Sequence, residues 1–282
     1  MRPAAFFLRP FFALMIGLMS VSFASVSAGA ADRDRLQAFL QVTGFDVSLE
    51  SIALSAEHAP DMLGMESGDF GDSWRAMAEQ VFATDLMKTM ALDMLSETLS
   101  DEMLDHAAGF YASDLGKRLV EVENASHMVE DDDVKRVEGE ALIAEYGSGP
   151  DSRTNVLQEL NQAVDSSGHG VRAVQELQIR FLMAASHAGV LENEIDEGAL
   201  RAAMAEQEAE LRQSISESSL LSAAYTYKDI SDDDLAAYRD ALSDPDMQQV
   251  YELMNAIQHE VMANRFETLA SRMAGLRRGQ DL

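Results

Sequence analysis

Two pairs of an acid and a histidine have a spacing that could support chemistry. Glu102 and His106, and likewise Glu123 and His127, stand four residues apart, so each pair would share one face of a helix. Such a pair could supply half of a metal site, but no Glu-x-x-His pair of the kind found in di-iron helical bundles occurs. We therefore favour a surface ion pair for both.

The acidic runs Glu130–Asp133 and Asp232–Asp234 are a second candidate for cation binding. Calcium needs several oxygen ligands at fixed spacing around a glycine turn, which residues 131–133 lack, so charge compensation at helix N-termini is the favoured interpretation. The chain contains no cysteine, which excludes thiol catalysis and thiolate metal sites. It also lacks a phosphate-binding glycine loop, a nucleophile elbow and a triad spacing. We expect no cofactor, no metal and no enzymatic activity.

The charge balance bears on partners. Against 21 Lys and Arg stand 49 Asp and Glu, for a formal charge of −28 over 282 residues. Nucleic-acid binding needs a cationic face, and an anionic lipid surface would repel this chain. A solvated acidic surface is favoured over a basic partner. The hydrophobic fraction of 47% is that of a globular protein.

Residues 1–30 have the features of a Sec-type signal peptide. Arg2 and Arg9 precede the apolar run Phe11–Phe23, and Ala28-Gly29-Ala30 forms a small-residue exit. The run is short for a membrane anchor, so we expect cleavage after Ala30. No later stretch is long and apolar enough to span a bilayer. The mature protein is therefore expected to be periplasmic or secreted, without a membrane span.

Helix-forming residues dominate the mature chain, and apolar residues recur at helical spacing. The pattern predicts an all-α fold. The expected helices are, in order, Asp32–Thr43, Leu49–His58, Ser73–Thr98, Asp101–Ala112, Asp114–Val129, Val134–Tyr146, Thr154–Val164, Gly170–Ala188, Asp196–Tyr227, Asp232–Leu242 and Pro245–Ala274. Gly44 is expected to end the first of them.

Two segments align without gaps at an offset of 131 residues, one from Leu99 and one from Ile230. Each predicts an antiparallel helical hairpin with a very short turn. The expected N-caps are Ser100 and Ser113 in the first copy, and Ser231 and Asp244 in the second, with Pro245 at the first helical position. A weaker upstream similarity suggests two related halves, residues 31–148 and 149–282, packed as a helical bundle. The pattern leaves open whether they form one core or two.

Phe110–Lys117 and Tyr225–Pro245 resemble an exported bacterial helical family of unknown function, DUF2059. The family pattern is an aromatic residue followed by Ser-Pro-x-Gly-x-Lys. Tyr111, Ser113, Gly116 and either Lys117 or Arg118 fit it in the first copy, where Asp114 replaces the proline. The second copy keeps Pro245 but has Met247 in place of the glycine. The resemblance implies an all-α fold and export, and it implies no activity.

Methionines at helical spacing suggest core filling, or alternatively an adaptable apolar groove. The groove between the halves would involve Trp74, Met90, Met94 and Met254. Our leading hypothesis is a non-enzymatic envelope interaction or structural protein with an unidentified protein partner. The alternative is a binding module that takes an apolar ligand or peptide in this groove.

Overall fold

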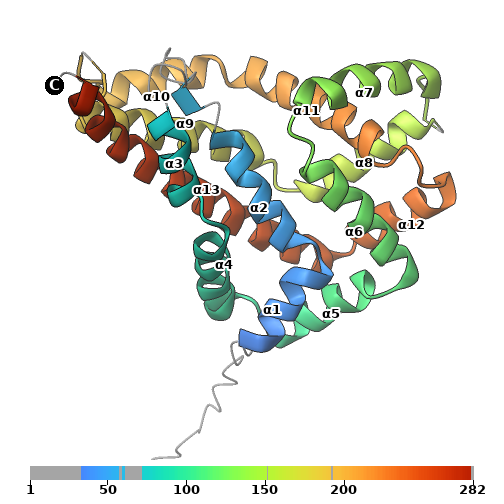
Figure 1. The fold of residues 1–282 in the computed structure, drawn as a ribbon. Coiled ribbons are helices and arrows are strands. Elements are labelled where there is room, and N and C mark those ends of the chain that lie inside the picture. Colours follow the sequence, from blue (N-terminus) through green and yellow to red (C-terminus); the bar gives the residue numbers. More distant parts are fainter. Residues whose placement is uncertain (1–32, 57–58, 61–71, 151, 192, 281–282) are drawn as a thin grey trace, which may run out of the picture.

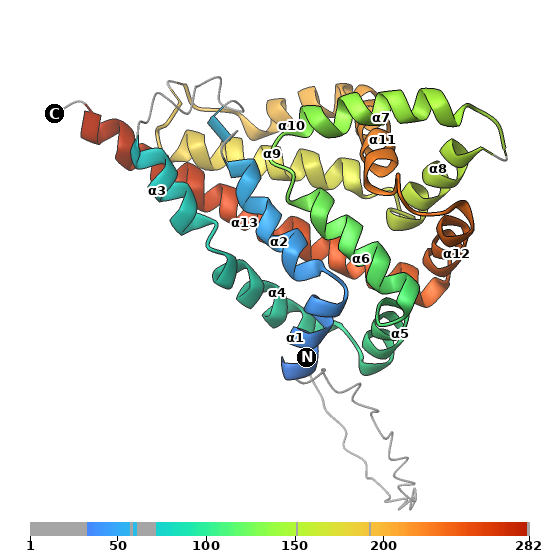
Figure 2. The same cartoon turned by 45° about the vertical axis from the view of Figure 1, so that its right-hand side comes forward.

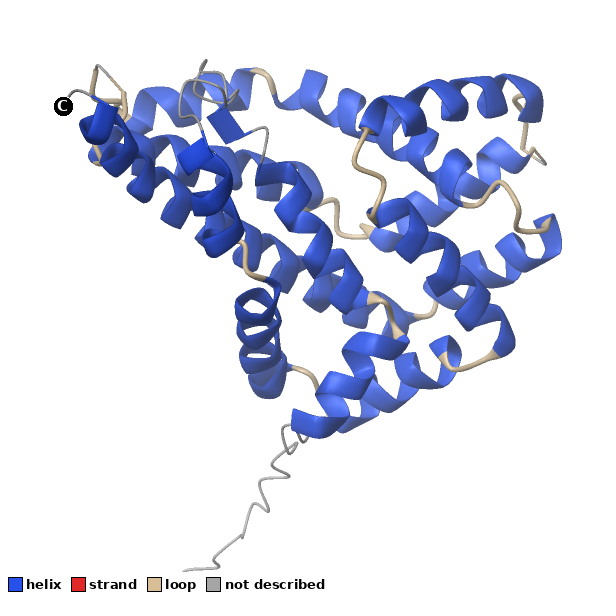
Figure 3. Ribbon diagram, in the orientation of Figure 1, coloured by secondary structure: helices blue, strands red, loops and turns tan. Residues whose placement is uncertain are grey.

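The computed structural model describes residues 33–56, 59–60, 72–150, 152–191 and 193–280. The predicted signal peptide lies outside these residues. Helices joined by turns make up the described part, without a strand, so the all-α prediction is confirmed (Figure 3). The helices, labelled in Figure 1, are α1 (Arg33–Val42), α2 (Phe45–Ser55), α3 (Asp72–Val81), α4 (Thr84–Thr98), α5 (Asp101–Tyr111), α6 (Asp114–His127), α7 (Asp132–Tyr146), α8 (Arg153–Val164), α9 (Gly170–His187), α10 (Glu197–Glu206), α11 (Glu208–Thr226), α12 (Asp232–Leu242) and α13 (Pro245–Gln280).

The long helix α13 is the central element of the bundle. It packs against α3, α4 and α5 from the first predicted half and against α8, α9 and α12 from the second (Figure 2). Likewise α11 packs along α7. Buried apolar side chains from both predicted halves belong to one cluster, which includes Leu36, Leu95 and Leu119 as well as Leu235 and Val261. The core is therefore shared between the two halves.

The predicted helix caps are confirmed. Ser100 Oγ accepts a hydrogen bond from the Met103 amide at 3.2 Å, and Ser231 Oγ accepts one from Asp234 at the same distance. The following turns are also capped. Ser113 Oγ accepts from the Gly116 amide at 3.0 Å, and Asp244 Oδ1 accepts from the Asp246 amide at 2.9 Å. Helices α5 and α12 have the same length, and α6 and α13 begin at equivalent positions. The duplication itself stays a prediction.

The single helix expected over residues 73–98 is divided into α3 and α4. Ala83 has an extended backbone (φ −56°, ψ 121°), and Phe82 before it is buried against Phe266, with ring centroids 5.1 Å apart. Val81 and Phe82 are both buried where α3 ends, directly before the break at Ala83.

The helix expected over residues 196–227 is also divided, at Gln207. The Met204 carbonyl accepts a hydrogen bond from Gln175 Nε2 at 2.7 Å, and a side chain that enters a helix ladder in this way commonly bends it. Before the bend, α10 packs on α9; after it, α11 packs against α7 and α8. The cause is a tertiary contact, which helical periodicity does not report.

Gly44 ends α1, as predicted, with a left-handed backbone (φ 71°). The second helix begins directly after it, at Phe45, four residues earlier than expected. A Cβ at Gly44 would lie only 2.4 Å from Asn124 Oδ1 on α6, so the glycine also permits a close contact between helices. Among the described helices, none combines the length and apolar character needed to cross a membrane.

Candidate functional site

A half-buried carboxyl group, that of Glu123 on α6, lies between the two predicted halves. Its Oε1 accepts hydrogen bonds from the hydroxyls of Tyr227 (2.7 Å) and Tyr238 (2.9 Å). Tyr227 directly follows α11, and Tyr238 lies on α12. The second oxygen, Oε2, accepts no hydrogen bond from the described residues. This oxygen is therefore available to a ligand.

Further tyrosines extend the hydrogen bonds behind the carboxyl group. The Tyr238 hydroxyl lies 3.0 Å from that of Tyr251 and 3.3 Å from that of Tyr111, and Tyr111 and Tyr251 are also hydrogen-bonded. The Phe110 ring stacks on Tyr238 with centroids 5.8 Å apart. Because these side chains come from α5, α12 and α13, this tyrosine cluster joins both hairpins.

The pKa shifts of these groups favour tyrosine hydroxyls as hydrogen-bond donors and the Glu123 carboxyl group as the acceptor. Burial raises the pKa of Glu123 above its ordinary value, although the hydrogen bonds from Tyr227 and Tyr238 partly counter this. Burial, and next the charge of Glu123, raise the pKa of Tyr227 and Tyr238. For Tyr251 too, burial is the main cause of a raised pKa. The hydroxyls therefore keep their protons at neutral pH.

A cavity of about 360 Å³ opens beside Glu123, and we call it the polar cavity. Its walls come from the α1–α2 turn and from α2, α6, α7, α8, α11, α12 and α13. The polar side chains that line it include Glu123, Asn124, Asn161, Ser219, Asn255 and Gln258. It has the size of a small-molecule site.

A second cavity of about 800 Å³ lies next to it, and we call it the apolar cavity. Its apolar lining comes from Met103, Val164, Ala173, Val174, Ile215, Leu253 and Ala256. Four residues, namely Asn161, Val164, Ser219 and Asn255, line both cavities. The two cavities are therefore adjacent, with α8, α11 and α13 contributing to both.

The residues of the predicted groove lie in the hydrophobic core or pack against it. Trp74, on α3, is buried in the core, while Met90 and Met94, on α4, are half-buried and pack against the core. Of the four residues, only Met254 lines one of the two cavities. For the first three, the structure places the side chains where core filling requires them.

The residues of the predicted motif lie at the turns within the two hairpins. Ser100, Ser113, Ser231 and Asp244 cap helices, and Pro245 begins α13. Tyr111 ends α5 within the tyrosine cluster. A Cβ at Gly116 would lie 2.4 Å from the Phe110 carbonyl oxygen, so the glycine allows α6 to approach the end of α5. In the second copy, the equivalent Met247 is buried instead.

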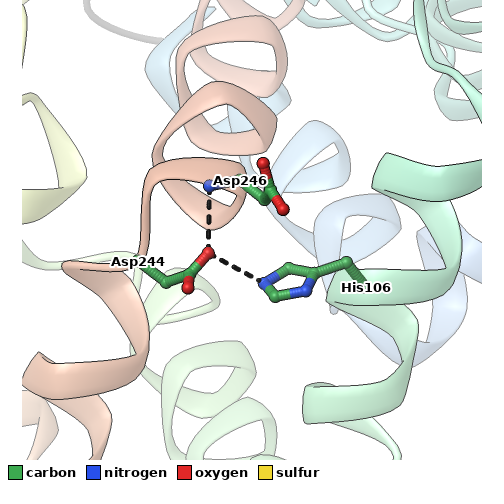
Figure 4. Close-up of side chains that lie close together, drawn as sticks. All are labelled: His106, Asp244 and Asp246. Atoms are coloured by element: carbon green, nitrogen blue, oxygen red, sulfur yellow. Dashed lines mark hydrogen bonds and ion pairs between the residues drawn. The ribbon is translucent and has the colours of Figure 1, made fainter.

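In each predicted pair of an acid and a histidine, one member has a different partner. His106 Nε2 lies 3.3 Å from Asp244 Oδ1, close to Asp246 (Figure 4). These three side chains are exposed, and Asp244 Oδ1 already caps α13, so the group is explained without a metal. Glu123 is bound by tyrosines, and burial, together with nearby Lys135, lowers the pKa of His127.

The acidic runs pair with helix ends and arginines. Asp131 Oδ1 caps α7 by accepting from the Asp133 amide at 2.9 Å. Asp232 pairs with Arg153, and Asp234 lies 2.8 Å from Arg118. The Asp131 cap agrees with helix-end compensation, whereas the contacts of Asp232 and Asp234 are ion pairs with arginines on α8 and α6.

A third depression, of about 710 Å³, surrounds Arg180 and Arg201. Arg180 pairs with Glu260 and Glu267, each at 2.7 Å, and Arg201 pairs with Glu176 at 2.7 Å. Since these charges already have partners, the depression is a weaker candidate than the two adjoining cavities.

Sequence reasoning did not identify the tyrosine cluster around Glu123. From the sequence, Tyr111 was recognised only as part of the motif that resembles DUF2059. The available signal was chemical: a buried tyrosine hydroxyl usually needs a hydrogen-bond partner. Several tyrosines on buried stripes, with a glutamate on the inner face of a neighbouring helix, could have indicated a polar centre.

Comparison with known proteins gives one significant similarity. No curated protein and no solved structure matches the chain significantly. The model of a family described as uncharacterized protein conserved in bacteria (DUF2059) matches residues 85–145, which contain Phe110–Lys117 and Glu123 but not Tyr225–Pro245; the predicted resemblance is thereby confirmed over this segment.

Proposed function

We propose that this chain is an exported, non-enzymatic binding protein of the cell envelope. It takes a small amphipathic ligand into the adjoining polar and apolar cavities between its two halves. One observation carries the proposal: the two cavities share the side chains of Asn161, Val164, Ser219 and Asn255. Two neighbouring cavities of this kind can hold the polar head and the hydrocarbon tail of one ligand.

The volumes of the two cavities and the chemistry of their side chains support this proposal. Volumes of about 360 and 800 Å³ fall in the range of small-molecule sites. The hydroxyls around the Glu123 carboxyl belong to tyrosines with raised pKa, which suits binding better than nucleophilic attack. Export is supported by the signal-peptide pattern of residues 1–30.

The test is a titration with the neutral fluorescent probe N-phenyl-1-naphthylamine. Ser219 lines both cavities, so S219W should obstruct them, whereas Ser218 is exposed and S218W is the matched control. We expect saturable fluorescence enhancement with the wild-type chain and S218W, and its loss with S219W. Equal binding by S219W and the wild type, or no saturable binding at all, would refute the proposal.

A second candidate is an interaction protein that binds a partner in the envelope through its helix faces. Met128, Val134 and Val137, at the junction of α6 and α7, are large apolar side chains that are at least 42% exposed. Exposed apolar patches mark interaction sites. A partner captured from periplasmic extract by the wild-type chain, and lost with V137D, would favour this function over the first.

A further inference from the structure

We infer that the ligand of the paired cavities carries a primary ammonium group, which binds beside the Glu123 carboxylate while its hydrocarbon chain lies in the apolar cavity. The inference rests on the proposed function and adds the chemical class of the ligand. Three observations support it: the unpaired acceptors of the polar cavity, the charge of the walls, and the position of the shared residues.

The polar cavity offers hydrogen-bond acceptors that have no donor among the described residues. Glu123 Oε2 accepts no bond from the described residues, while its Oε1 is engaged by two tyrosines. Asn255 Nδ2 donates to the Val164 carbonyl at 2.9 Å, which leaves the Asn255 amide oxygen as its free polar atom. Asn124 Oδ1 is buried without a hydrogen-bond partner in the described part of the chain. An ammonium group has three donors and no acceptor, so it complements such a lining.

Taken together, the walls of the two cavities carry more negative than positive charge, with three carboxylates against one lysine. Glu123 lines the polar cavity, and Asp165 and Glu252 line the apolar one. The Lys135 ammonium, the lysine of the polar cavity, lies 2.7 Å from Asp132 and is therefore already paired. These charges favour a cation over the carboxylate of a fatty acid.

Two of the three histidines in the walls, His127 and His259, do not reverse this balance. Burial lowers the pKa of His127, and Lys135 lowers it further. Burial is also the main cause of a lowered pKa for His259, although Asp165 partly counters it. Both imidazoles are therefore neutral at neutral pH.

An amine whose head group lies beside Glu123 can direct its chain past Asn255 and Ser219, which line both cavities.

The experiment is isothermal titration calorimetry with three probes of equal chain length: octylammonium, octanoate and 1-octanol. The mature chain is used at neutral pH and physiological ionic strength, together with E123Q. Glutamine keeps a carbonyl oxygen for Tyr227 and Tyr238, so the tyrosine cluster is preserved. E121Q is the matched control, because it removes an equal charge from an exposed position on the same helix.

We expect octylammonium to bind at least about tenfold more tightly than octanoate, because the carboxylate pairs with one ion and repels the other. E123Q should weaken octylammonium binding by about tenfold to hundredfold, the range of a charge-assisted hydrogen bond. It should leave 1-octanol unchanged. E121Q should behave as the wild type. In Q258E, which adds a carboxylate to the polar cavity, octylammonium should bind more tightly, and this variant keeps the test valid if E123Q folds poorly.

Two results would overturn the inference alone: octanoate binding as tightly as octylammonium, or E121Q weakening octylammonium binding as much as E123Q. In either case, 1-octanol binding that is lost in S219W would leave the proposed function intact. If neither octylammonium nor 1-octanol binds the wild-type chain, the proposed function fails as well.

Discussion

Replacing Gly116 by alanine tests whether the α5–α6 hairpin depends on close backbone contact. A Cβ at this position would lie 2.4 Å from the Phe110 carbonyl oxygen and 2.5 Å from Tyr111 Cα, both closer than real Cβ atoms approach. Because the neighbouring atoms belong to the backbone, no side chain can rotate away, and α6 must shift relative to α5. Gly109, on α5, is the matched control, since a Cβ there meets nothing within 4 Å.

The comparison separates the contact from helix propensity. Exchanging glycine for alanine inside a helix gains up to about 1 kcal/mol, and this gain applies to both variants. Overpacking costs about 1–3 kcal/mol and applies to G116A alone. We therefore expect the free energy of unfolding of G116A to be about 1–3 kcal/mol below that of G109A.

Urea unfolding followed by circular dichroism at the helix band measures this difference. G109A should unfold at the same urea concentration as the wild type or a higher one, and G116A at a lower one. If G116A equals or exceeds G109A in stability, the close approach at the turn does not constrain the hairpin, and the reasoning is wrong.

Three further predictions concern the buried polar contacts. Because the pKa of Glu123 is raised in the folded state, the free energy of unfolding of the wild type should fall relative to that of E123Q as the pH rises from 4 through that pKa. Each tenfold difference in the acidity of Glu123 between the folded and unfolded chains corresponds to about 1.4 kcal/mol. Urea unfolding between pH 4 and 7.5 measures the difference in stability between the two proteins, and a difference that stays constant over this range would contradict the prediction. Y238F should lower the free energy of unfolding by about 0.5–1.5 kcal/mol, because it removes a hydrogen-bond donor to Glu123. A thermal unfolding midpoint equal to that of the wild type would argue against this. In R153M, the carbonyl oxygens of Tyr227 and Ile230 lose their shared donor, which should cost about 1–3 kcal/mol of unfolding free energy; wild-type stability in urea would exclude that cost.

Local chemistry explains what could be predicted from the sequence. A cap involves atoms within three residues of each other, so Ser100, Ser113 and Ser231 could be assigned from their neighbours alone. Gly44 could be assigned for the same reason, since a left-handed residue after a helix favours glycine.

Features that depend on distant parts of the chain could not be predicted in this way. The break at Ala83 depends on the packing of Phe82 against Phe266, and the bend at Gln207 on the contact with Gln175. The site has the same limitation. Glu123 was predicted to interact with His127 on its own helix, but its partners come from helices about one hundred residues away in sequence.

The length of α13 has a consequence for how this molecule unfolds. At 1.5 Å per residue, its 36 residues extend for about 54 Å, and both predicted halves pack against it. Neither predicted half keeps all of its packing contacts when the other half is removed. We therefore expect one cooperative melting transition for the whole chain. Protease cleavage after Gly147 should produce two fragments that co-elute in native chromatography and separate only in denaturant.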